Sequence, residues 1–149
     1  MAIRPAEASD LAEICSLIRE LAEYEELAHE VELDEATVGR WLFGDQPVAS
    51  VLIAEDAPRV VAGMALYFPT FSTFLGRPGI WLEDLFVRPA YRGRGHGLAL
   101  LSALRSMTED RIEWAVLDWN EPSIRFYESL GSRPVSGWTR YRWLPEGRR

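Results

Sequence analysis

Three glycines alternate with charged or polar residues from Arg92 to Gly97, in the order Arg-Gly-Arg-Gly-His-Gly. Glycine lets the backbone turn tightly and point several N–H groups to one side, and the start of a following helix adds a positive dipole end. Arg88, Arg92 and Arg94 add positive charge, and the arginine fork matches phosphate oxygens. This pattern predicts an anion site that suits a pyrophosphate.

Two familiar phosphate-binding loops do not fit this segment. The loop of nucleotide hydrolases needs a lysine after its second glycine, and the chain contains no lysine. The dinucleotide-binding fingerprint needs a glycine where Leu98 stands. The alternative that stays open is a strand-to-helix turn that needs glycine only for its shape.

Two consecutive acids, Glu83 and Asp84, interrupt the apolar strand predicted at Ile80–Val87. Burying a carboxylate costs free energy unless the group is paired, hydrated or functional, so two in succession point to a site. Adjacent strand residues point to opposite faces, so the two acids cannot form a close pair and must do different work. The alternative is that one pairs with an arginine and the other caps backbone groups.

Two further features have both a structural and a functional interpretation. Ser123 and Tyr127 lie four residues apart in the helix predicted after Asn120 and share a face, which could equally be a packed face. Eight carboxylates and no arginine fall between Glu20 and Glu35. This acidic segment is either a solvated helix end and loop or a rim that attracts a cation.

The elements that must position these residues follow from the apolar pattern. Asp10 and Glu13 have capping-box spacing at the start of an amphipathic helix. The expected strands are 2–4, 48–55, 60–68, 80–87 and 112–118, and the expected helices are 10–25, 34–42, 98–110 and 121–130. A hairpin turn is expected at 56–59, a loop at 69–79 and a strand-like tail at 133–144. Antiparallel strands followed by a βαβα unit predict a mixed α/β fold.

Length and composition predict one domain over residues 1–149. No apolar run approaches the roughly 20 residues of a membrane helix, and the N-terminus lacks a secretory signal, so we expect a cytoplasmic protein without a membrane partner. The net charge of −7 disfavours nucleic acid and favours small cationic partners. One cysteine, Cys15, and two histidines, His29 and His96, are too few for the usual zinc sites, so no metal is expected.

Arg92–Gly97 resembles the acetyl-CoA motif Arg/Gln-x-x-Gly-x-Gly/Ala of the GNAT N-acetyltransferase superfamily. Four segments are similar to its diamine (spermidine/spermine and thialysine) acetyltransferase branch, and they are Arg19–Glu25, Leu82–Val87, Tyr91–Gly97 and Trp119–Tyr127. The order of elements agrees across nearly the whole chain. The resemblance implies a GNAT-like acyl-CoA N-acyltransferase fold, with pantetheine between splayed strands 80–87 and 112–118. It also implies direct transfer of acetyl from acetyl-CoA to a primary amine of a diamine, polyamine or thialysine-like substrate in a ternary complex.

The resemblance also implies roles for individual residues. Glu83 would remove the ammonium proton through water, and Tyr127 would protonate the departing CoA sulfur. Tyr24, Glu25, Glu83 and Asp84 would line the amine side. The cofactor side would comprise Phe86, Val87, Arg88, Arg92, Gly93, Arg94, Gly95, His96, Gly97, Asn120, Ser123, Phe126 and Tyr127, with a main-chain N–H of Phe86 or Val87 polarising the thioester carbonyl.

Family members usually form dimers, so a homodimer is expected as well. The loop at 70–79 and the C-terminal tail differ from the diamine branch, and both regions shape the amine pocket there. The identity of the amine therefore stays open. The alternatives are a GNAT enzyme that acetylates an amino acid, a peptide α-amine or an antibiotic amine, and a non-catalytic acyl-CoA-binding sensor.

Overall fold

The computed structural model describes residues 1–148 and divides the chain into two compact units, Met1–Ala115 and Val116–Arg149. The N-terminal unit holds a sheet and its helices. Its strands are β1 (Ala2–Pro5), β2 (Ser50–Ala57), β3 (Val60–Ser72), β4 (Arg77–Val87) and β5 (Ile112–Glu113). Its α-helices are α1 (Leu11–Tyr24), α2 (Glu35–Phe43) and α3 (His96–Arg105).

The sheet has the order β1-β2-β3-β4-β5, with antiparallel pairing up to β4 and a parallel β4–β5 pair. The mixed α/β prediction is therefore confirmed. In the parallel ladder Ile80 lies opposite Ile112 and Trp81 opposite Glu113, and the ladder ends there. The predicted strand at 112–118 is thus wrong beyond Glu113, and β4 runs on to Val87 past the last β5 pair.

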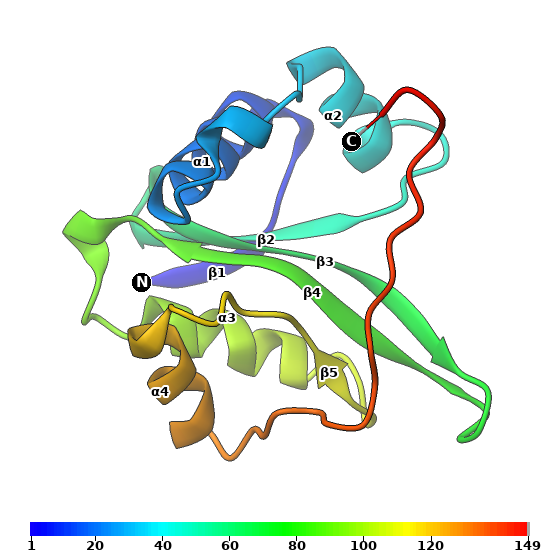
Figure 1. Cartoon of the computed structure of the whole chain (residues 1–149). Helices are drawn as coiled ribbons and strands as arrows, with labels where there is room; N and C mark the ends of the chain where they lie inside the picture. The colour runs from blue at the N-terminus through cyan, green and yellow to red at the C-terminus, as the bar shows by residue number, and fades with distance from the viewer. Residues whose placement is uncertain (149) are drawn as a thin grey trace. The chain divides into compact units, whose positions relative to one another are not determined.

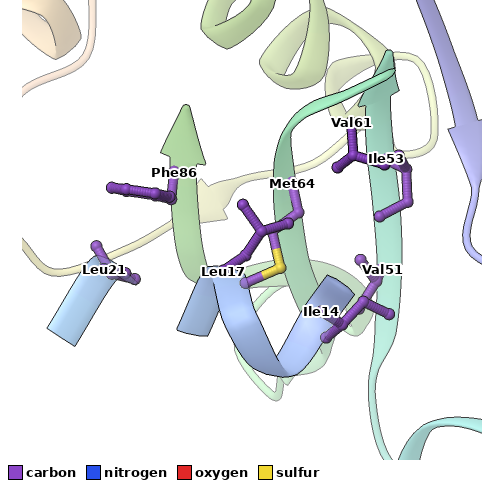
Figure 2. Packing of buried hydrophobic residues seen from close by; sticks show 8 residues of the cluster. All are labelled: Ile14, Leu17, Leu21, Val51, Ile53, Val61, Met64 and Phe86. Carbon is purple, nitrogen blue, oxygen red and sulfur yellow. The ribbon is translucent and has the colours of Figure 1, made fainter. Parts of the chain in front are cut away.

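Helices cover both faces of this sheet, with α1 and α2 on one side and α3 on the other (Figure 1). Figure 2 shows the α1 side, where Ile14 and Leu17 pack between apolar side chains of the strands. The full cluster is Ile14, Leu17, Leu21, Val51, Ile53, Val61, Met64 and Phe86. Alternation sends Leu52 and Ala65 to the opposite face, where Leu100 and Leu104 of α3 are fully buried. Both layers together fix the position of β4.

The predicted loop at 69–79 is wrong, because β3 and β4 continue as a hairpin. Pro69 lies opposite Ile80 and Ser72 opposite Arg77, so only a short turn remains, with Gly76 in the left-handed region at φ 68°. Thr70 and Phe71 favour extended backbone, and pairing with β4 outweighs the proline and glycine signals in this segment.

The boundaries of two helices, α1 and α3, differ from the prediction for local reasons. Asp10 does not cap α1 through Glu13; its Oδ2 instead accepts the Glu7 backbone N–H at 2.7 Å and a bond from Arg4 at 2.8 Å. Helix α3 begins at His96 rather than Leu98, because left-handed Gly95 directly precedes its first turn. It ends at Arg105 rather than at 110, where the Arg105 guanidinium donates to the carbonyls of Thr108 and Asp110.

The C-terminal unit contains α4 (Glu121–Ser129), which matches the predicted helix to within one residue. The strand-like tail predicted at 133–144 is wrong, since that segment contains no strand. Its side chains Trp138, Tyr141 and Trp143 are 82%, 90% and 99% exposed. Alternating aromatic residues suit a strand, but a strand forms only where another strand pairs with its backbone.

Candidate functional site

The glycine turn between β4 and α3 has the geometry of an anion cradle. Gly93 and Gly95 both adopt the left-handed region, at φ 76° and 89°, which only glycine enters at low cost. A Cβ at Gly93 would meet nothing within 4 Å, so the backbone conformation rather than crowding explains this glycine. The turn leads into the first N–H groups of α3, which have no intrahelical partners.

The three arginines near this turn are held in different ways. The Arg88 guanidinium contacts Glu13 at 2.7 Å and Glu20 at 3.0 Å and also donates to a backbone carbonyl at 3.1 Å, so it ties α1 to the end of β4. Arg94 donates to Asp56 at 2.7 Å. Arg92 is exposed, and its Nε donates to the Val87 carbonyl at 2.8 Å. Of the three, Arg92 is the side chain that donates a hydrogen bond to the backbone at the end of β4.

His96 is anchored by a contact that the sequence did not indicate. Its side chain is buried, and its Nε2 lies 2.8 Å from Oδ1 of Asp56. A carboxylate oxygen only accepts, so Nε2 carries the hydrogen. The sequence predicts that Asp56 lies in a hairpin turn and indicates no function for it, because a contact across 40 positions leaves no local signal.

A β-bulge separates the two acids of β4. Leu66 lies opposite Asp84 while its neighbour Tyr67 lies opposite Leu82, so Glu83 is the extra residue of β4. Bulges re-aim side chains and are common beside active sites. Glu83 is exposed and accepts a hydrogen bond of 2.7 Å from the indole Nε1 of Trp81. Asp84 is half-buried, so the two acids have different environments, as their adjacency predicts.

Asp84 is the acid whose ionisation is perturbed most clearly. Burial, together with the charges of Glu83 and Glu25, raises the pKa of Asp84 to about 7. Burial also raises the pKa of Glu25, which follows the C-terminal end of α1. A cation placed among these carboxyls would offset both the desolvation and the mutual repulsion. The arrangement therefore favours a positively charged ligand.

The backbone at the end of β4 is held by a close approach of β3. Gly63 lies opposite Val87, and a Cβ at Gly63 would stand 2.3 Å from the Phe86 carbonyl oxygen. Any other residue would push these two strands apart. The Phe86 side chain is buried in the core on the α1 side, as Figure 2 shows, so the peptide group between Phe86 and Val87 has a fixed position.

The remaining predicted site residues lie in the C-terminal unit, on or next to α4. Asn120 is buried, and its Oδ1 accepts the Ser123 backbone N–H at 3.4 Å, which caps the helix. Ser123 and Tyr127 stand one turn apart and are half-buried. The rings of Phe126 and Tyr127 lie 5.5 Å apart with a 50° tilt. The helix therefore presents one hydroxyl from serine and one from tyrosine in successive turns.

Residues 11–132 match the Acetyltransferase (GNAT) family, a range that includes the glycine turn, both acids of β4 and α4. The chain belongs to this family. It is an acetyl-CoA-dependent N-acetyltransferase, which confirms the resemblance carried by the glycine loop. No group of three His, Cys, Asp or Glu side chains within residues 1–148 is placed to hold a metal ion.

Curated relatives agree with this assignment, and a solved structure shares the fold. The chain is 35% identical to the mouse thialysine N-epsilon-acetyltransferase over 99% of its own length and 94% of that protein. It is also 35% identical to the human spermidine/spermine N(1)-acetyltransferase-like protein 1, over 97% of this chain and 22% of that one. An integron cassette protein from the mobile metagenome of V. cholerae has the same fold, with a TM-score of 0.79, 23% identity and coverage of 98% and 93%. None of the helices among the described residues has the length and apolar character to span a membrane.

Proposed function

We propose that this GNAT enzyme acetylates a primary amine of a small cationic substrate, a diamine, a polyamine or a thialysine-like amino acid. The observation that carries the proposal is the set of three carboxyls at Asp84, Glu83 and Glu25, where the pKa values of Asp84 and Glu25 are raised. Such a set is stabilised by a bound cation. The names of the mouse and human relatives point to the same class of amine.

The proposed reaction is direct attack of the amine on acetyl-CoA in a ternary complex. An alkyl ammonium with a pKa near 10 must first lose a proton. Asp84 and Glu25 hold the ammonium, and the exposed Glu83 passes the proton to solvent through water. Asp84, whose pKa of about 7 matches neutral pH, supports this step as a second proton acceptor in the same set.

Two further groups complete the proposed acetyl transfer. As the amine nitrogen bonds to the carbonyl carbon, a main-chain N–H at Phe86 or Val87 stabilises the oxyanion. The C–S bond then breaks, the phenol of Tyr127 donates its proton to the thiolate, and the second proton that the nitrogen loses restores the phenol. The sum is amide, CoA thiol and one proton released to solvent. The fixed backbone opposite Gly63 supports the oxyanion role, since preorganised donors stabilise charge best.

The proposed coenzyme site uses backbone more than side chains. The N–H groups of Arg92–Gly97 and the start of α3 bind the pyrophosphate, and Arg92 adds a charge. The guanidinium groups of Arg88 and Arg94 are paired with the carboxylates of Glu13 and Asp56. These two arginines therefore support the coenzyme site by holding the surrounding elements in place. Asn120, Ser123 and Phe126 of the α4 region are assigned to the same coenzyme by the family resemblance.

We also propose that residues 1–149 form one acetyltransferase domain, because the family match runs from the N-terminal unit into the C-terminal unit. We propose further that the enzyme is cytoplasmic and forms a homodimer. Support for the dimer comes from the tail, where Trp138, Tyr141 and Trp143 expose aromatic surface that a second copy could bury.

A panel of amines tests the proposed function. Initial rates of CoA release from acetyl-CoA are measured with diamines, spermidine, thialysine, single amino acids, a peptide α-amine and an aminoglycoside. We expect the highest kcat/KM for a substrate with two cationic groups, and a marked drop for a monoamine of equal length. A preference for the peptide or the aminoglycoside would instead support the alternative acetyltransferases. CoA binding without stimulation by any amine would support a sensor.

A further inference from the structure

Asp56 occupies an unusual place at the end of β2. Glu55 lies opposite Val61 and Ala57 lies opposite Val60, so Asp56 is left out of the β2–β3 register as the extra residue of a bulge. A bulge turns the side chain of its extra residue away from the regular alternation. The Asp56 carboxylate is thereby directed at the glycine turn, 38 and 40 residues further along the chain.

The Asp56 carboxylate contacts the glycine turn on both sides of Gly95. Oδ2 accepts from the Arg94 guanidinium at 2.7 Å, and Oδ1 accepts from His96 Nε2 at 2.8 Å. Gly95 between them is in the left-handed region at φ 89°. One carboxylate therefore fixes the two residues that flank this left-handed glycine of the turn.

His96 and Arg94 differ in how they complete this contact. The His96 side chain is 1% exposed, whereas the Arg94 side chain is 54% exposed and also lies over the Tyr91 ring, 5.5 Å from its centroid. The Nδ1 of His96 is the buried side-chain polar atom that has no hydrogen-bond partner within residues 1–148. Asp56 thus supplies the polar contact that holds this buried imidazole at the first position of α3.

We infer that Asp56 is a positioning residue for coenzyme binding. Its hydrogen bonds to Arg94 and His96 hold the N–H groups of the glycine turn in the geometry that binds the pyrophosphate. This inference rests on the proposed function, which assigns the pyrophosphate to Arg92–Gly97. Asp56 itself carries a negative charge, so it acts through the turn and not by touching the phosphate.

This role predicts that a change of the Asp56 carboxylate weakens acetyl-CoA binding more than it slows the chemical step. Asp56→Asn keeps size but can accept at one oxygen only, so one flank of Gly95 is released. We expect the KM for acetyl-CoA to rise about tenfold, with kcat within about twofold, because the interaction lost serves binding and not the chemical step. Arg94→Gln, on the exposed side of the contact, should raise the same KM about threefold and leave folding intact.

A truncated donor separates positioning from general stability. Acetylpantetheine carries the same thioester but no pyrophosphate, so the glycine turn has nothing to hold. Asp56→Asn and wild type should use acetylpantetheine with equal kcat/KM, whereas they differ with acetyl-CoA. Asp45→Asn, an exposed acid of the segment before β2, is the matched control and should match wild type with both donors.

Each outcome of this experiment is decisive. An equal loss with both donors, accompanied by a lower melting temperature, would show that Asp56 only stabilises the fold and would overturn the inference. An unchanged KM for acetyl-CoA in both Asp56→Asn and Arg94→Gln would overturn it too, while a wild-type preference for acetyl-CoA kept the proposed function intact. A wild-type enzyme that uses the two donors equally well would instead reject the pyrophosphate site at Arg92–Gly97 itself.

Discussion

The guanidinium carbon of Arg92 lies 5.0 Å from the centroid of the Tyr24 ring and 5.5 Å from that of Phe86. Arg92 belongs to the glycine turn, which we assign to the coenzyme, and Tyr24 ends helix α1 directly before Glu25, which we assign to the amine. The stacked pair therefore connects the two proposed binding regions within the N-terminal unit. Loss of the ring at position 24 should therefore weaken the binding of the coenzyme.

Substitution of Tyr24 tests this connection. A cation–π contact of this kind contributes about 1 kcal/mol, which corresponds to about a fivefold change in affinity. Tyr24→Leu should therefore raise the KM for acetyl-CoA about fivefold, while Tyr24→Phe, which keeps the ring, should leave it within about twofold. Steady-state kinetics with acetyl-CoA as the varied substrate measures both. Equal effects of the two substitutions would show that the hydroxyl, and not the stacking, matters.

The raised pKa of Asp84 predicts a specific pH dependence of stability. Asp84 ionises near 3.8 when unfolded and at about 7 when folded, so between these values the folded state binds more protons. Its contribution to stability therefore falls as the pH rises from about 4 to about 7. Asp84→Asn should raise the free energy of unfolding at pH 8 by at most about 4 kcal/mol, and by much less at pH 4.

Urea unfolding of the two proteins at pH 4, 6 and 8 measures this difference. Glu83→Gln, at the exposed neighbouring position, is the control and should shift the curve much less. A wild-type protein that is as stable as Asp84→Asn at pH 8 would contradict the assigned burial of the carboxyl.

The same group predicts a pH dependence of activity. The amine side needs Asp84 as a carboxylate, so kcat/KM for the amine should fall as the pH drops below about 7, the pKa in the free enzyme. Asp84→Asn should lower kcat/KM by at least about tenfold and remove this limb of the profile. Profiles of both proteins between pH 5 and pH 9 measure it, and an unchanged limb in the variant would assign the ionisation to another group.

The close approach at Gly63 predicts a sharp contrast between two glycines. Gly63→Ala places a methyl group 2.3 Å from the backbone oxygen of Phe86 and should lower the free energy of unfolding by about 3 kcal/mol. Gly39→Ala, in α2, meets only the flexible Leu11 side chain at 2.9 Å and gains helix propensity, so its effect should lie within about 1 kcal/mol. Thermal unfolding compares the two. A tolerated Gly63→Ala would show that the peptide after Phe86 is not held as described.

Structural features that depend on neighbouring residues could be predicted from the sequence. Features that depend on contacts between distant residues could not. The apolar spacing of α1 and the glycines before α3 are local, and they predict α1 to within one residue at each end and the start of α3 to within two residues. Two features depend on the pairing register between β3 and its neighbouring strands, which no short segment specifies. They are the bulge at Glu83 and the hydrogen bond between Asp56 and His96. The sequence therefore predicts site residues at Glu83 and Asp84, which are adjacent, but it gives no signal for Asp56.

In the tail, by contrast, the sequence predicts an element that does not form. Alternation at Trp138 and neighbouring aromatic residues favoured a strand over 133–144, but the segment has no strand partner in the described chain. Local propensity for a strand is weaker than the requirement that its backbone groups be paired.

Direct transfer of acetyl to the amine is tested by following the acetyl group. The protein is incubated with isotope-labelled acetyl-CoA and the best amine of the panel, and the label and free CoA are quantified together by mass spectrometry. Direct transfer predicts one labelled N-acetyl group on a primary amine of the substrate for each CoA released, with no labelled protein. Label retained on the protein, or CoA release that does not depend on the amine, would contradict direct transfer to a small cationic amine.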